Sequence, residues 1–170
     1  NEHPEVDYVY SDEDKVSADG ARFFGAFHKP GWSPEYLLTL MYTCHLGAYR
    51  MSIAKAIGGY RTEFDTAQDL DFTLRFLLRT KKVRHIPRVL YHWRAGEGST
   101  AMSGDEKPYA VEAGRRAVRD YLTQSGARAT VAPARIGAYN RVRYELPDPL
   151  PMVSIIIPTK NGVSLLRRCI

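Results

Sequence analysis

Two carboxylates close together in the sequence, Asp12 and Asp14, are the side chains whose type and spacing most directly suggest chemistry. They follow Val6–Tyr10, a run of β-branched and aromatic residues that predicts a short buried strand. In an open α/β sheet, the ligand site lies just beyond the carboxyl ends of the strands. Oxygen ligands at such a place can meet a divalent cation that carries phosphates. The alternative interpretation is an acidic turn that faces only water.

A third carboxylate, Asp69, lies at the predicted start of a helix. Thr66 has the position of an N-cap, and Asp69 follows three residues later, which is the spacing of a capping box. Four leucines between residues 70 and 78 then recur with the helical period. They predict an apolar stripe that packs against a sheet, with Asp69 in the first turn of the helix.

Periodicity and turn residues predict the other elements that must position these groups. We expect helices over 34–41, 51–57 and 106–124, strands over 42–49, 83–86, 89–93 and 153–159, a hairpin of 129–131 with 141–144, and a flexible loop over 96–105. Three prolines at 147, 149 and 151 indicate a stiff spacer before the last strand. That strand is apolar throughout, as in parallel sheets that are covered on both faces.

The composition is that of an ordinary globular protein. Of 170 residues, 44% are hydrophobic and 25% are charged. Cys44 and Cys169 provide no disulfide framework, which favours a reducing compartment. The formal charge of +5 comes from scattered basic residues, so it indicates a mild attraction to anionic surfaces and argues against a nucleic-acid-binding module.

The chain contains four motifs, namely Ser11–Asp14, Gly58–Arg61, Ala67–Asp71 and His85–Arg94. Taken together, they resemble the C-terminal half of an inverting family-two nucleotide-sugar glycosyltransferase of the GT-A fold. The subgroup that the chain is most similar to has tandem domains and builds bacterial surface polysaccharide. The resemblance implies an α/β fold, namely a partial GT-A domain that is Rossmann-like, with a mixed, mostly parallel sheet and helices on both faces.

The same resemblance divides the chain into three parts. Residues 1–104 would be the C-terminal half of one glycosyltransferase domain, and 105–150 would be a helix, a hairpin and a proline-rich connector. Residues 151–170 would be the first strand and helix start of a second such domain, so the chain would be a fragment of a longer polypeptide. The first strands of the family's fold would precede Val6, and we therefore expect the fragment alone to be inactive. Because an unpaired strand edge is a strong pairing template, we expect 153–158 to fill the place beside 6–10, in the same molecule or by strand exchange in a dimer.

The chemistry of that family assigns a role to each candidate residue. An acceptor hydroxyl displaces a nucleoside diphosphate, so one carboxylate takes the hydroxyl proton, and a cation, Mg²⁺ or Mn²⁺, offsets the charge of the departing diphosphate. By resemblance, the catalytic base is Asp69, the donor-binding residues are Asp12, Gln68 and Arg94, the metal ligands are Asp12, Asp14 and His92, and the acceptor-side residues are His28, Trp32 and His45.

Each assignment has a structural alternative. These are a helix cap for Asp69, a hydrogen-bonded structural role for His92, an ion pair with Glu97 for Arg94, and a place in the core for Trp32. Cys44, in an apolar stretch, is expected only to pack in the core. Two residues depart from the family pattern. Gln68 stands where an acidic neighbour of the base is usual, and Met41 stands where a polar residue is frequent on the acceptor side.

The sequence therefore favours a glycosyltransferase fragment that transfers a sugar from a nucleotide-sugar donor to a growing surface polysaccharide. The acceptor would be a saccharide or a lipid-linked saccharide. The location would be the cytoplasm, with peripheral contact at the cytoplasmic face of the inner membrane. The alternative is a non-catalytic polysaccharide- or partner-binding scaffold of the same fold. For an enzyme, we expect Asp12, Asp14 and Asp69 to gather round one pocket.

Overall fold

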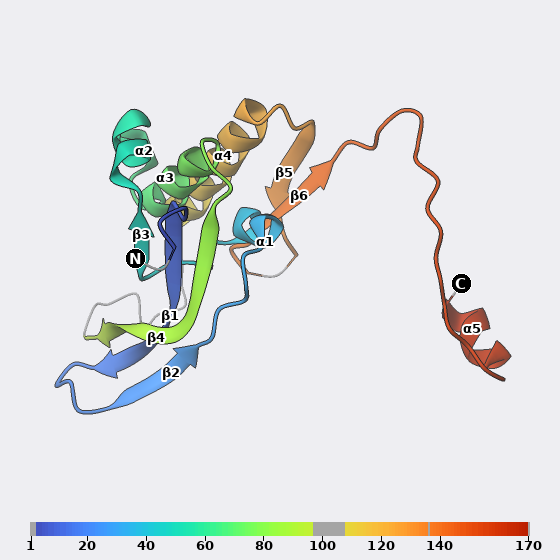
Figure 1. Ribbon diagram of the computed structural model, residues 1–170, viewed down its shortest axis with the longest axis horizontal. Coiled ribbons are helices and arrows are strands. Elements are labelled where there is room, and N and C mark those ends of the chain that lie inside the picture. The colour runs from blue at the N-terminus through green and yellow to red at the C-terminus, as the bar shows by residue number, and fades with distance from the viewer. Residues whose placement is uncertain (1–2, 97–107, 136, 170) are drawn as a thin grey trace.

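The computed structural model describes residues 3–96, 108–135 and 137–169. A four-stranded mixed sheet forms its centre (Figure 1). The sheet consists of β1 (Tyr8–Ser17), β2 (Phe23–Phe27), β3 (Gly47–Tyr49) and β4 (Val83–Ala95). The helices are α1 (Pro34–Thr39), α2 (Met51–Ala56), the 3₁₀ turn η1 (Thr62–Phe64), α3 (Gln68–Leu77), α4 (Pro108–Gln124) and α5 (Val163–Cys169). β5 (Ala129–Pro133) and β6 (Asn140–Tyr144) form a separate hairpin.

The core forms where β1 meets α3 and α4. Alternate residues of β1 point inward, so Tyr8 and Tyr10 are fully buried. Phe76 of α3 is also fully buried, with its ring 6.4 Å from that of Tyr8, and Val118 of α4 joins the same cluster. Each fully buried side chain of this size stabilises the fold by roughly 1.5–3 kcal/mol. This cluster holds α3, and with it the predicted base, against the sheet.

The fold is α/β, but the prediction of a mostly parallel, Rossmann-like sheet is not supported. Among the described strands, β1 is parallel to β4 and antiparallel to both β2 and β3. For β2 the reason is the length of its connection to β1. The turn of residues 18–22 between β1 and β2 is too short for the crossover that parallel strands need.

The C-terminal segment does not complete the sheet. Within the described range 137–169, residues 153–158 form no strand, and Val153 and Ile156 are 77% and 89% exposed. β1 also has no open side there, because Val9 is paired with Ala48 of β3 and with Arg84 of β4. The predicted pairing of 153–158 beside 6–10 is therefore wrong, and the described strands leave no edge at this place for a second copy. Figure 1 shows the segment leading away from the rest of the molecule to α5.

Several predicted elements are confirmed, and others have different bounds. The helices at 34–41 and 51–57 and the hairpin agree with α1, α2, β5 and β6. The predicted strand 42–49 is reduced to the three residues of β3, and Cys44 lies in the loop before it. The two predicted strands around Pro87 form one continuous strand, β4. Most of the predicted loop 96–105 lies outside the described residues.

Candidate functional site

The acidic residues lie inside β1 and not in a turn beyond it. The register of β1 against β4 shifts on both sides of Asp12: Ser11 is opposite Ile86, and Asp12 is opposite Val89. Such irregularities redirect neighbouring side chains. As a result, the three consecutive acids contact three different sets of partners.

Asp12 is 3% exposed, and hydrogen-bonding groups surround its carboxylate. The Lys29 amide donates to Oδ1 at 3.0 Å, and His85 Nε2 lies 2.7 Å from the same oxygen. His28, which is exposed, places Nδ1 3.3 Å from Oδ2. Burial opposes the charge of Asp12, but the hydrogen bonds from Lys29, His85 and His28 outweigh it and lower the pKa of Asp12 below its ordinary value.

Glu13 is a buried charged residue inside the Ser11–Asp14 motif, to which the sequence assigned no role. The Lys29 ammonium donates to Oε2 of Glu13 at 2.9 Å and to the Thr43 carbonyl at 2.6 Å, and it also bonds the His45 carbonyl. The His45 amide donates to the same Glu13 oxygen at 3.0 Å. Burial opposes the charge of Glu13, but its bonds with His45 and Lys29 lower its pKa overall. Glu13 thereby fixes the loop that carries His45.

Asp14 forms a pair with His92 of β4. Asp14 Oδ1 lies 2.5 Å from His92 Nδ1, and the imidazole is about half exposed beside the Phe23 ring. Among the residues that the structure describes, no three His, Cys, Asp or Glu side chains are grouped so as to hold a metal ion. The Asp14 carboxylate by itself still fits Mg²⁺, which proteins often hold by one or two carboxylates together with substrate phosphates, whereas an imidazole suits transition metals better.

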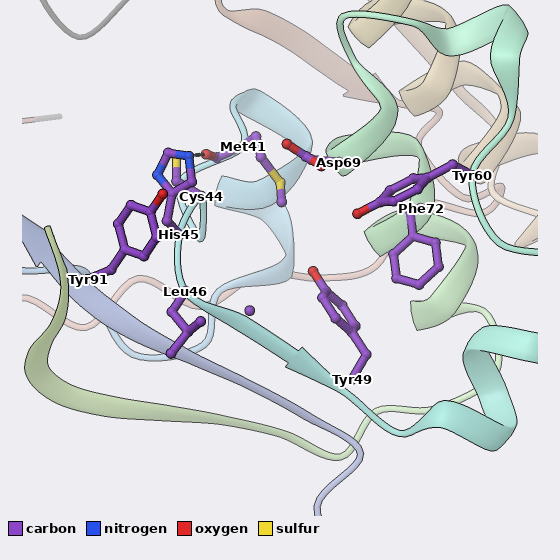
Figure 2. Close-up of a pocket in the computed structure, with 10 residues that line it drawn as sticks. Met41, Cys44, His45, Leu46, Tyr49, Tyr60, Asp69, Phe72 and Tyr91 are labelled. Carbon is purple, nitrogen blue, oxygen red and sulfur yellow. Dashed lines mark hydrogen bonds between the residues drawn. The ribbon is translucent and has the colours of Figure 1, made fainter. Parts of the chain in front are cut away.

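A cavity of about 180 Å³ lies beside Asp69, at the first turn of α3 (Figure 2). Figure 2 shows Tyr91 and His45 on one side of it and Asp69, Tyr60 and Phe72 on the other. The lining residues are Met41, Cys44, His45, Leu46, Gly47, Tyr49, Tyr60, Asp69, Phe72 and Tyr91. Aromatic rings therefore form much of the wall, and one carboxylate faces the space.

Asp69 is not the capping residue that the spacing predicted. α3 begins at Gln68 with Ala67 as its N-cap, and no side-chain hydrogen bond caps this described helix end. Thr66 has a φ of 76°, in the left-handed region, so it is not in the extended conformation that an N-cap requires. The Asp69 side chain is exposed toward the cavity. Gln68 has a buried Oε1 that has no hydrogen-bond partner among the described residues.

Two tyrosines line the same cavity as Asp69. Burial, the Asp69 charge and a hydrogen bond with Asp69 all raise the pKa of Tyr60. Burial is also the main reason that the pKa of Tyr49 rises to about 12, and its hydroxyl lies 2.8 Å from Thr73 Oγ1. Both phenols therefore remain protonated at neutral pH and can act as hydrogen-bond donors.

His45 forms the opposite wall. Its ring stacks on Tyr91, with centroids 4.6 Å apart and planes 13° apart, and lies 5.1 Å from the Trp93 ring. Nδ1 lies 3.3 Å from Glu13 Oε2. The predicted acceptor-side residue His45 is thus in the cavity, held there by the middle acid of β1.

The structure does not bring Asp12 and Asp14 into the cavity that holds Asp69. Glu13 is opposite Tyr91 in the register and Asp14 is opposite His92. Because neighbouring residues of a strand point to opposite faces, the Asp14–His92 pair lies on the other face of the β1–β4 pair from Tyr91. The expected meeting of all three carboxylates in one pocket is therefore not what this chain shows.

The remaining predicted residues lie elsewhere. Arg94 donates through Nη1 to the Ala18 carbonyl at 2.8 Å, near the end of β1, while Glu97 lies outside the described residues. Trp32 packs on the core, with its ring 6.5 Å from Tyr8 and 6.4 Å from Tyr10. His28 contacts Asp12 and is not among the residues that line the described cavity.

Comparison with known proteins identifies relatives along nearly the whole chain. No family model matches it. The uncharacterized protein y4gI of Sinorhizobium fredii is 39% identical over 168 residues, which is 97% of this chain and 18% of that protein. The O-antigen biosynthesis protein RfbC of Myxococcus xanthus is 39% identical over 165 residues, which is 96% of this chain and 13% of that protein. The chain thus spans less than a fifth of the length of these relatives.

Within residues 3–96, 108–135 and 137–169, no helix combines the length and the apolar character needed to cross a bilayer.

Proposed function

We propose that this chain is part of a glycosyltransferase, of the GT-A type, that helps to build a bacterial surface polysaccharide. The donor would be a nucleotide sugar, and the acceptor a saccharide or a lipid-linked saccharide. One observation carries the proposal: Asp69 faces a cavity walled by aromatic rings, in a chain 39% identical to an O-antigen biosynthesis protein. The name of that relative supports a role in polysaccharide synthesis. The residues of the Asp69 cavity support the more specific proposal of sugar transfer.

The cavity wall suits a sugar. A sugar ring has an apolar face of C–H groups and a rim of hydroxyls, so it packs on aromatic rings while its hydroxyls need polar partners. Phe72 and Tyr91 offer the rings, and the Tyr60 and Tyr49 hydroxyls offer polar groups. Asp69 adds a carboxylate that can accept a hydroxyl proton.

Asp69 would act as the general base. It stands on a helix packed into the core, so the carboxylate is held on a rigid element. An acceptor hydroxyl hydrogen-bonded to it would lose its proton to Asp69 as the oxygen attacks the anomeric carbon and the nucleoside diphosphate leaves.

In this proposal, Asp14 and His92 would be the protein ligands of a cation. Bound Mg²⁺ or Mn²⁺ would supply positive charge to the departing diphosphate. Asp14, with its carboxylate beside His92, fits this role better than Asp12, because both oxygens of Asp12 are already bonded to protein groups. Asp12 would instead hold His85 and the Lys29 backbone in place.

One observation favours the alternative, a non-catalytic polysaccharide-binding scaffold. The Asp14–His92 pair and the Asp69 cavity are on different faces of the β1–β4 pair. An aromatic cavity without a cation beside it could bind a saccharide without turnover.

The test is a panel of sugar nucleotides offered to the full-length protein with Mn²⁺ and a saccharide acceptor. If Asp69 is the base, Asp69→Asn lowers turnover by about 10²–10⁴-fold while the donor still binds. Asp65→Asn, which changes a nearby exposed carboxylate, is the matched control and should retain wild-type turnover. Saccharide binding without turnover, unchanged in Asp69→Asn and in Asp14→Asn, would favour the scaffold.

A further inference from the structure

A buried charge network joins α3 to the loop that precedes it. Asp71 is two residues beyond Asp69 on α3, and its side chain is 2% exposed. Arg61 Nη2 donates to Asp71 Oδ1 at 2.5 Å, and Arg75 Nε donates to Oδ2 at 2.9 Å. One buried carboxylate therefore joins two arginines, one from the loop before α3 and one from α3 itself.

Arg75 also binds the backbone of the loop that carries Tyr60. Its guanidinium donates to the Ile57 carbonyl at 2.7 Å and to the Gly59 carbonyl at 2.5 Å. The Arg75 side chain is only 11% exposed, so these charge-assisted bonds are shielded from water. Because Tyr60 follows Gly59 directly, the position of Tyr60 depends on this bond.

The other described bonds of this loop include backbone turns from Gly58 to Lys55 and from Gly59 to Ala54, and the Arg61 side-chain bonds beyond Tyr60. Gly58 and Gly59 have φ values of 80° and 69°, in the left-handed region, and an added Cβ at either would meet no atom of the described residues within 4 Å. Tyr60 itself is 63% exposed, with its ring 5.0 Å from that of Phe72. A loop that is exposed and built on glycines has many conformations open to it unless other groups hold it.

We propose that Arg75 and Asp71 are positioning residues that hold Tyr60 against Asp69, and that Tyr60 forms the wall on which the acceptor sugar packs. The packing of a sugar on Tyr60 rests on the proposed function. The clamp, meaning the hold of Arg75 and Asp71 on the loop that carries Tyr60, does not. The guanidinium of Arg75 is suited to this role because its planar fork can bond a carboxylate on one edge and carbonyls on the other. Lys could bond only as a point charge.

The clamp is tested by NMR titration of ¹³C-labelled tyrosines in the full-length protein, with Tyr60→Phe identifying the Tyr60 signal. In Arg75→Gln, Tyr60 should move away from Asp69 into water, so its pKa falls toward the ordinary value of about 10. Arg79→Gln, an exposed arginine on the helical turn after Arg75, should leave the Tyr60 titration unchanged. An unchanged titration in folded Arg75→Gln would overturn the proposal.

A second variant tests the clamp without leaving Asp71 as a poorly paired buried charge, which could by itself disturb folding. Arg75→Gln leaves Asp71 with less positive charge around it, whereas Asp71→Asn/Arg75→Gln removes both charges and still releases the loop. Both variants should lose up to about 10²-fold in kcat/KM for the acceptor, with turnover at saturating acceptor less affected. If the wild type transfers no sugar but Tyr60 still responds to Arg75→Gln, the clamp stands and the glycosyltransferase proposal fails.

Discussion

At the scale of single residues, the ammonium of Lys29 organises the acidic end of β1. It is fully buried and has three acceptors: one oxygen of Glu13 and the carbonyls of Thr43 and His45. A buried ammonium is tolerated only when it is paired and hydrogen-bonded in this way. The consequence is that the position of His45 in the cavity depends on a lysine that contacts no cavity space itself.

Lys29→Met should therefore lower the free energy of unfolding of the protein. It leaves the Glu13 carboxylate buried without its cation, and breaking one side of a buried pair costs about 3–5 kcal/mol. The measurement is the free energy of unfolding in urea. Lys55→Met, at an exposed position on α2, should change it by less than about 0.5 kcal/mol. Equal effects of the two substitutions would show that the buried pair contributes nothing.

The same carboxylates predict how stability depends on pH. The pKa values of Asp12 and Glu13 are lowered from ordinary values of 3.8 and 4.5, so the unfolded chain binds protons that the folded chain does not. Their contribution is fully present above these values and is lost as pH falls through them toward the lowered folded values. Urea midpoints measured between about pH 6 and pH 3 should therefore decline on acidification.

The matched variant for this titration is Asp12→Asn, which removes one of the two groups. Its midpoint should decline less steeply below about pH 4 than that of the wild type. Asp65→Asn, at an exposed carboxylate, serves as the control and should keep the wild-type slope. A slope in Asp12→Asn as steep as in the wild type would assign the acid sensitivity to other groups.

Residue chemistry was only partly predictable from the sequence. Asp12, Asp14 and Asp69 stood out by type and motif, and Tyr60 and Glu13 lay within two of the motifs. No local pattern gave Glu13 a role or pointed to Lys29. Their importance comes from burial and from contacts between residues 16 positions apart or more. Partner choice of this kind is set by the register of β1, which no short sequence pattern encodes.

At the scale of elements, the loop from α2 to η1 shows how backbone conformation serves the site. The sequence predicted the end of α2 correctly, because two successive glycines stop a helix. It did not predict the start of α3, where the Thr66–Asp69 spacing of a capping box occurs without the capping bond. The left-handed conformation of Thr66 breaks the motif, and sequence spacing alone cannot reveal a dihedral angle.

Gly59→Ala should destabilise the loop by about 1–2 kcal/mol, because a side chain disfavours the left-handed conformation even where space is available. Gly31→Ala is the matched control, since that glycine also has open space around it but no left-handed φ. The measurement is the change in unfolding free energy in urea. If both substitutions have the same effect, then the backbone of Gly59 is not restrained as described.

At the scale of the whole molecule, the chain divides into a packed part and an exposed part. The cluster of Tyr8, Phe76 and Val118 holds the sheet to α3 and α4, and the apolar segment 153–157 is exposed. Hydrophobic periodicity predicted most helices because their apolar stripes are local. The composition of the apolar segment predicts a buried strand. A strand forms only where a partner edge is open, however, and both sides of β1 are occupied.

Hydrogen exchange should separate these two parts. Residues 8–10 are paired with strands on both sides of β1, so their amide hydrogens should exchange slowly. The amide hydrogens of 153–157 should exchange at nearly the rate of an unstructured peptide. Peptide-resolved mass spectrometry of this chain gives the comparison. Strong protection at 153–157 would show that the segment is covered, and would contradict its exposed position.

The irregular pairing of β1 with β4 has a further consequence for how such sites can change. Between Asp12 and Glu13, β4 advances two positions, from Val89 to Tyr91, so Leu90 has no partner in the register. A deletion of one residue there would move every following side chain of β4 to the opposite face of the sheet, while the residues of β4 before the deletion keep their faces. Tyr91 and His92 would exchange sides without any change in their identity. In this stretch the count of residues, and not only their chemistry, decides which surface carries the imidazole and which carries the phenol.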